Sequence, residues 1–225
     1  MADKSQKPAI VLVPGAFHTT RYLEPVVEIL RSSGYSAVAV PMPSIGAKPP
    51  LPDLSQDIAA IRRASLDYLD HSSERRAEGK TTWVKAIVYV AGHVIPKGMS
   101  LVELMGGGHP PFIIQKDGYA SLEGPEDRLY HDLPENERKH WASQMQPQSL
   151  GVFESKLPCD TYKQIPTSYL ICTEDHFVPT PDIQEKMASD ASCFLVEKVA
   201  SSHSPFLSKP QETAAFIMKT AEHQK

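Results

Sequence analysis

The sequence has few of the residues that build metal centres. Only three of its 225 residues are cysteine, namely Cys159, Cys172 and Cys193. Their number is odd and their spacing is not that of metal ligands, so no metal site is expected, and nothing else in the sequence implies a cofactor. Cys172 and Cys193 lie in or beside strand-like runs, where a buried free thiol is the expected state.

The chain also lacks an excess of positive charge and a long apolar run. Its net charge of −4 and its pI of about 6.1 give no reason to expect nucleic acid or an anionic membrane as a partner. The apolar run at residues 9–13 is too short for a signal-peptide core and far too short to span a bilayer. We therefore expect a cytoplasmic protein that binds a small-molecule substrate or ligand, with a homodimer as an open alternative to a monomer.

Apolar runs alternate with helical periodicity along most of the chain, which predicts one α/β domain over residues 1–225, with a mostly parallel sheet and helices on both faces. Strands are expected at residues 10–13, 36–40, 84–90, 168–172 and 193–197. Helices are expected at residues 22–33, 54–69, 135–145, 181–188 and 210–222. Residues 99–156 lack this rhythm, and we interpret them as a cap inserted over the C-terminal edge of the sheet.

Two residues near the C-terminus have the order and placement of a catalytic acid and its histidine. Asp175 follows the strand expected at residues 168–172, and His203 follows the strand expected at residues 193–197. Side chains at the carboxyl ends of parallel strands point into a shared crevice. An acid and then a histidine, each at a strand end with a helix between them, is the order of an acyl-transfer site of the α/β type.

Neighbouring residues are weaker candidates for the same two roles. Taken alone, Asp175 would be interpreted as a surface aspartate and His203 as a loop histidine. Because both follow neighbouring predicted strands in the order of a catalytic acid and base, the pair favours a catalytic role. Glu174 stands one residue before Asp175 and is expected to face the other way. The histidines less favoured as the base are His18, His93 and His176.

A glycine-containing turn follows the first predicted strand. Gly15 lets the backbone N–H groups of Ala16 and Phe17 point at an oxyanion that develops during acyl transfer. A turn after a strand also needs glycine for steric reasons, so this signal is moderate by itself.

Several stretches together make the chain resemble the small α/β-hydrolase family that includes plant methylesterases, hydroxynitrile lyases and fungal and bacterial esterase-like proteins. The stretches are residues 10–18, 85–92, 129–134, 147–151, 169–175 and 201–210. The resemblance implies an α/β-hydrolase fold, with Asp175 and His203 as acid and base and with Ala16 and Phe17 as oxyanion donors.

The sequence contains no Gly-x-Ser-x-Gly motif, which in this family carries the nucleophile on a turn between a central strand and a helix. That unit, roughly 20 to 25 residues at average lengths, belongs between about Leu69 and Trp83. The chain offers only a charged linker at residues 70–82, so the central elbow strand is interpreted as deleted. Two other segments could be considered as the nucleophile elbow, and neither fits. Residues 71–73 have Asp70 where the first glycine of the motif should stand. Residues 92–96 would place Val94, which cannot attack a substrate, in the nucleophile position.

The missing elbow leaves three explanations for the chain. It is a truncated product of an ordinary serine esterase, a binding pseudoenzyme, or a non-hydrolytic isomerase or cyclase that uses His203 and Asp175. We favour the truncated esterase. Its ancestral activity would be hydrolysis of a small apolar ester or related carbonyl compound, and hydrolysis by this chain would be impaired. The candidates for lining the site are the cap aromatics Trp141, Phe153 and Tyr162, although packing in the core of the cap is the simpler interpretation of each.

Losing a central strand also predicts a structural consequence. Two sheet edges would stay unpaired unless the strand at 84–90 moves over to join the strand at 10–13.

Overall fold

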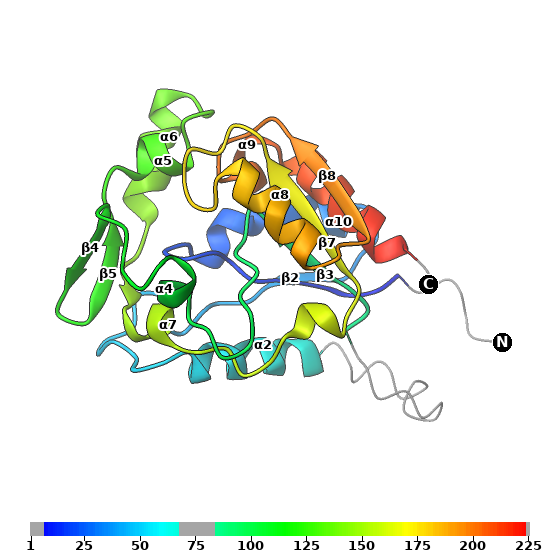
Figure 1. The fold of residues 1–225 in the computed structure, drawn as a ribbon. Helices are drawn as coiled ribbons and strands as arrows, with labels where there is room; N and C mark the ends of the chain where they lie inside the picture. The colour runs from blue at the N-terminus through cyan, green and yellow to red at the C-terminus, as the bar shows by residue number, and fades with distance from the viewer. Residues whose placement is uncertain (1–6, 68–83, 224–225) are drawn as a thin grey trace.

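The computed structural model describes residues 7–67 and 84–223 (Figure 1). The linker at residues 70–82 and the rejected candidate elbow at residues 71–73 lie outside the described residues. The end of the helix expected at 54–69 lies outside them as well.

The five expected parallel strands all form, with small changes at their ends. They are β1 (Ile10–Leu12), β2 (Ala37–Ala39), β3 (Ile87–Val90), β7 (Thr167–Cys172) and β8 (Leu195–Val199). They make two parallel sheets within the described residues, of orders β1-β2 and β3-β7-β8. All six residues of β7 are buried, as expected for a strand with a neighbour on each side and helices above and below.

Strands β1 and β3 each have one edge that no strand occupies in the described ranges. β1 pairs with β2 and β3 pairs with β7, so the strand at 84–90 does not move over to β1. All four residues of β3 are only half-buried, unlike those of β7. β1 and β3 still share a core cluster, because Val88 packs against the group that contains Leu12 and Ala214. The two sheets are thus joined through side chains and helices rather than through backbone pairing.

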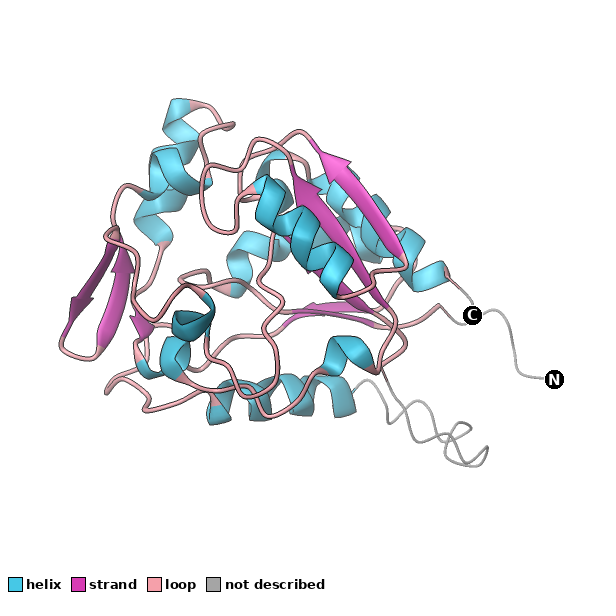
Figure 2. Ribbon diagram, in the orientation of Figure 1, coloured by secondary structure: helices cyan, strands magenta, loops and turns pink. Residues whose placement is uncertain are grey.

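Helices cover both faces of this sheet region, as expected (Figure 2). They are η1 (Thr20–Leu23), α1 (Glu24–Ser32), α2 (Ser55–Asp67), η3 (Thr161–Lys163), α8 (Pro181–Asp190), α9 (Pro205–Ser208) and α10 (Pro210–Glu222). On one face α1 packs against α10, where Val26 lies in one cluster with Ala214 and Ile217. On the other face α8 covers β7, with Ala188 in the same cluster as Tyr169.

Residues 99–156, which we call the cap, form more regular structure than the sequence pattern indicated. They contain α4 (Leu101–Leu104), β4 (Ile113–Lys116), β5 (Tyr119–Leu122), α5 (Pro125–Leu129), α6 (Glu135–Gln144), β6 (Gln148–Ser149) and α7 (Gly151–Glu154). The helix expected at 135–145 is confirmed as α6. The antiparallel hairpin β4–β5 was not expected, although its Asp117-Gly118 turn, with φ of 50° and 79°, is a recognised hairpin signal.

No helix within the described ranges is both long and apolar enough to cross a bilayer. The three cysteines are unpaired: Cys172 is buried, Cys193 is half-buried and Cys159 is exposed. Burial raises the pKa of the Cys172 thiol to about 12, which makes it unreactive at neutral pH.

Candidate active site

The structure brings Asp175 and His203 together. They lie in the loops after β7 and β8, which are neighbouring parallel strands, so their carboxyl ends meet at one edge of the sheet. The Nδ1 atom of His203 is 2.7 Å from Oδ2 of Asp175. The Asp175 side chain is fully buried and that of His203 is 19% exposed. A buried carboxylate beside a partly accessible imidazole is the arrangement that orients a catalytic base.

Two further donors hold the Asp175 carboxylate in place. Gln184 Nε2 donates to its Oδ2 at 2.9 Å, and the Phe177 N–H donates to its Oδ1 at 2.8 Å. Gln184 is itself fixed, because its Oε1 accepts from the Cys172 N–H and its Nε2 also donates to the Pro179 carbonyl. Sequence reasoning missed Gln184, since a glutamine in the first turn of α8 looks like an ordinary surface residue.

The hydrogen bond to Asp175 fixes the tautomer of His203. A carboxylate only accepts, so Nδ1 carries the proton and the Nε2 lone pair of the neutral ring is left for a substrate or a water. Nε2 has no hydrogen-bond partner in the part of the chain that the structure describes. The Phe177 ring packs edge-on against the imidazole with the ring centroids 5.0 Å apart, which restricts its rotation.

Glu174, the rival acid, does not reach His203. Its side chain is exposed, and its backbone carbonyl accepts from Nε2 of His131 at 2.8 Å. His176 is also exposed and stacks on the His131 ring, with the centroids 4.3 Å apart. The geometry therefore favours Asp175 as the acid, and the catalytic roles of Asp175 and His203 stay predictions.

The oxyanion turn differs from the expectation in one donor. Phe17 has a left-handed backbone, with φ of 68°, and its N–H donates to Oε1 of the buried Gln148 at 3.1 Å. Gln148 is held in turn by its Nε2 donating to Ser44 Oγ. The Phe17 N–H is thus engaged by a cap residue, and its role as an oxyanion donor stays a prediction. The Ala16 N–H has no partner among the described residues and remains the available donor.

His18 is a buried neutral residue rather than a base. Its Nδ1–H donates to the Ala16 carbonyl at 2.6 Å, so its Nε2 accepts from the Tyr130 hydroxyl at 2.7 Å. Its ring also packs edge-on against Tyr22 and Phe206. Burial lowers the pKa of His18 to about 4. His18 therefore stays uncharged at neutral pH and links the oxyanion turn to the cap.

The lowered pKa of His18 predicts a loss of stability in acid. Between pH 6.5 and 4 the unfolded chain binds a proton that the folded chain does not, so the free energy of unfolding falls as the pH falls. We expect His18 to account for a loss of about 2 kcal/mol between pH 7 and pH 4.5. Urea unfolding at both pH values should show a smaller loss for His18→Asn than for the wild type. The exposed His140 is the control: His140→Ala should lose as much as the wild type, and an equal loss in His18→Asn would contradict the assignment.

His93 lies close to the Asp175–His203 pair, at the carboxyl end of β3. Burial, and to a lesser extent the charge of His203, lower its pKa to about 4. Its ring makes no hydrogen bond to any described residue. Val94, the residue that the alternative elbow would use, is buried in the cluster that contains Tyr169. The structure thus adds a neutral imidazole beside the pair but no nucleophile at this turn.

The three candidate lining aromatics lie in different places. Phe153 packs against Phe17 with the ring centroids 5.8 Å apart, and Trp141 packs against Tyr22 at 5.0 Å. Both thus support the region of the oxyanion turn. Tyr162 lies outside the cap, in the core cluster beneath α8, so it is not a lining residue of this site.

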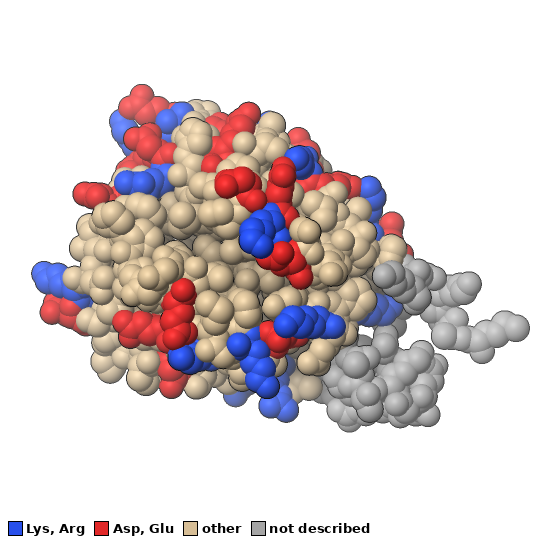
Figure 3. All heavy atoms as spheres, viewed as in Figure 1, with Lys and Arg blue, Asp and Glu red and all other residues tan. Residues whose placement is uncertain are grey.

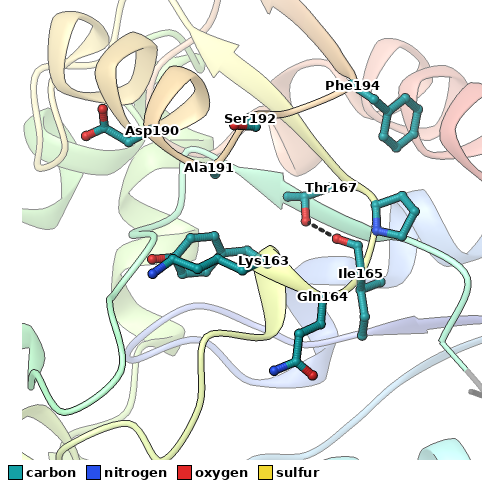
Figure 4. Close-up of a pocket in the computed structure, with 10 residues that line it drawn as sticks. Lys163, Gln164, Ile165, Thr167, Asp190, Ala191, Ser192 and Phe194 are labelled. Carbon is teal, nitrogen blue, oxygen red and sulfur yellow. Dashed lines mark hydrogen bonds between the residues drawn. The ribbon is translucent and has the colours of Figure 1, made fainter.

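A surface cavity of about 400 Å³ lies at the opposite end of the sheet (Figure 4). It is formed where β7 begins, after α8 ends and before β8 begins. Its lining residues are Tyr162, Lys163, Gln164, Ile165, Pro166, Thr167, Asp190, Ala191, Ser192 and Phe194. None of the candidate catalytic residues lines it. On the face seen in Figure 3, Lys, Arg, Asp and Glu side chains of both signs are spread over the surface, with tan surface between them.

Comparisons with known proteins identify the family and support the fold. The model of the alpha/beta hydrolase family matches residues 10–216. The alpha/beta hydrolase nvfD of Aspergillus novofumigatus is 27% identical over 244 residues, with 96% of this chain and 97% of the relative covered. Two solved structures share the fold at a TM-score of 0.70. The first is a methylesterase from Arabidopsis, which is 16% identical, with 94% of this chain and 98% of that chain covered. The second is a pyrethroid hydrolase from Sphingobium faniae, which is 18% identical, with 96% of this chain and 97% of that chain covered.

Proposed function

Because this chain belongs to the alpha/beta hydrolase family, we propose that it carries an esterase-type acid–base site for a small, largely apolar ester or related carbonyl compound. His203 is the base, Asp175 orients it, and the Ala16 N–H is the oxyanion donor. The observation that carries the proposal is the 2.7 Å contact between Nδ1 of His203 and Oδ2 of Asp175, with Nε2 left without a partner among the described residues. The esterase-like neighbours support the substrate class.

Without an elbow serine, His203 activates water directly. Nε2 removes a proton from a water molecule, whose oxygen attacks the ester carbonyl. The Ala16 N–H stabilises the oxyanion, and His203 returns the proton to the alkoxide as the C–O bond breaks, which gives an acid and an alcohol. In triad enzymes that lose one member, binding and the oxyanion hole still accelerate the reaction about 10³- to 10⁴-fold over water. Hydrolysis by this chain is therefore expected to be slow.

Two observations support a missing strand–elbow–helix unit as the cause. The alignment with nvfD is 244 residues long, more than the 225 residues of this chain, so the relative holds residues without counterparts here. Strands β1 and β3 also each have an unoccupied edge within the described ranges, where a central strand would fit. Both support a longer form of this protein that is an ordinary serine esterase.

A second candidate function is acid–base chemistry without hydrolysis, such as an isomerisation or a cyclisation. The observation that favours it is His93, a neutral imidazole close enough to His203 and Asp175 to interact with both charges. His203 would remove a proton from carbon next to a carbonyl, and His93 N–H would donate to the carbonyl oxygen.

Fluorophosphonate labelling and a panel of short esters test the proposal on the folded protein. We expect no labelled serine and slow hydrolysis that falls at least tenfold in His203→Ala, since the base is lost. The exposed His140 offers a matched control, and His140→Ala should hydrolyse the esters at the wild-type rate. Hydrolysis that does not change in His203→Ala would overturn the proposal. Exchange of carbonyl α-protons that depends on His203, without hydrolysis, would favour the second candidate instead.

A further inference from the structure

One short segment of the cap bonds to all three loops of the site. The segment is residues 129–132, at the C-terminal end of α5 and just before α6. Its Tyr130 hydroxyl donates to His18 in the oxyanion turn at 2.7 Å, and its His131 Nε2–H donates to the carbonyl of Glu174 in the acid loop at 2.8 Å. No two of these three loops are adjacent in the sequence, so the segment holds together parts of the chain that meet only through folding.

The third contact is made to the loop of the base. The Ser202 N–H, one residue before His203, donates to Oδ2 of Asp132 at 2.9 Å. The hydroxyl of Ser202 donates to the Leu129 carbonyl at 2.8 Å, so the same residue is held twice by the cap segment. Ser202 itself is fully buried.

We infer that residues 129–132 are a positioning segment that sets the three loops relative to one another, and that Asp132 is the positioning residue for His203. This inference rests on the proposed role of His203 as a base. A bond to an ionised carboxylate is about twice as strong as one between neutral groups. Because that bond holds the amide next to His203, it limits how far the imidazole can move from Asp175. A misplacement of about 1 Å at a reacting group can lower a rate roughly 10²-fold.

The state of Asp132 agrees with this role. Burial acts to raise the pKa of its carboxyl, but hydrogen bonding, which includes the bond from the Ser202 N–H, outweighs burial and lowers it. Asp132 therefore stays charged at neutral pH. Another acidic cap residue, Asp127, is exposed and pairs with Arg138 within the cap at 3.6 Å. Among the described residues it makes no hydrogen bond or ion pair to the three loops.

The test uses a property of the resting protein. NMR of the ¹⁵N-histidine-labelled full chain gives the solvent-exchange rate of the His203 Nδ1 proton, which is protected by the bond to Asp175. We expect Asp132→Ala to raise this exchange rate at least tenfold. Asp132→Asn should keep most of the protection, because its amide oxygen still accepts from the Ser202 N–H. Asp127→Ala should leave the exchange rate unchanged. If Asp132→Ala does not fold, Ser202→Ala is used instead. It removes the bond to the Leu129 carbonyl and a long contact of 3.5 Å from the Ser204 N–H, and it should give a smaller rise in the exchange rate.

Several results would overturn the inference. The first is an exchange rate of the His203 Nδ1 proton that does not change in folded Asp132→Ala. If Asp132→Ala does not fold, an unchanged rate in Ser202→Ala has the same meaning. The last is a rise of this exchange rate in Asp127→Ala that equals the rise in Asp132→Ala. Since no turnover is needed, the proposed function can fail separately: esters hydrolysed equally by wild type and His203→Ala would remove the function and leave the structural coupling measurable.

Discussion

Replacing residues 70–82 with a strand–turn–helix segment that carries a Gly-x-Ser-x-Gly elbow should raise ester hydrolysis by about 10³-fold or more. In the proposed site, His203 is held by Asp175 and the Ala16 N–H is free to donate, so the nucleophile is the member that the site lacks. Members of a triad act as a unit: loss of the serine alone costs about 10⁶-fold in a well-studied protease. Initial rates on short esters and fluorophosphonate labelling of the chimera measure the gain.

A serine-to-alanine change in the inserted elbow is the matched control for this chimera. It should abolish labelling and activity but keep any gain in thermal stability, because an inserted strand would still occupy the free edges of β1 and β3. A folded chimera that takes no label would contradict the deletion hypothesis. Activity that survives in the alanine control would show that hydrolysis does not depend on the elbow.

Gly151→Ala should destabilise the protein by about 4 kcal/mol, at the upper end of what single substitutions do. A Cβ atom at this position would stand 2.1 Å from the Pro52 carbonyl oxygen and 3.2 Å from that of Leu51. These are backbone atoms of the segment before α2, which is also bonded to the cap through the Leu51 N–H and Ser149 Oγ. Because backbone cannot rotate away as a side chain can, the cap and this segment must separate. The melting temperature should fall by roughly 10 °C.

Gly108→Ala is the control for this prediction. Gly108 also lies in the cap, but a Cβ atom there would have no neighbour within 4 Å. Its melting temperature should stay within about 2 °C of the wild type, since exposed substitutions change stability by less than 0.5 kcal/mol in general. A Gly151→Ala protein as stable as Gly108→Ala would mean that the cap does not pack on the segment before α2.

The strands and helices of the sheet region could be predicted because each depends on local residue order. The last four residues of the buried strand β7, 169–172, read as an apolar run, and α10 lies where residues 210–222 repeat apolar positions at helical spacing. The cap was harder to predict, because its strands are short and half exposed. Only the hairpin turn at Asp117 and Gly118, where both residues have positive φ, carries a local signal in the sequence.

The candidate site was predictable where it depends on strand ends and not where it depends on packing between distant segments. The placement of Asp175 and His203 follows from neighbouring parallel strands that end at one edge. The engagement of the Phe17 N–H by Gln148 joins residues 131 positions apart, so no local pattern could indicate it. Gln184 is identified only by its contact with Asp175.

The sequence by itself determined the family, the order of acid and histidine, and the absence of a Gly-x-Ser-x-Gly motif, because each is a statement about residues in a row. Only the tertiary structure decided which strand pairs with which. β3 stays with β7 instead of joining β1, because backbone pairing and side-chain packing along β7 outweigh the free edge. It also decided that residues 129–132 contact three separate loops of the site, since hydrogen bonds between distant segments form only once the chain has folded.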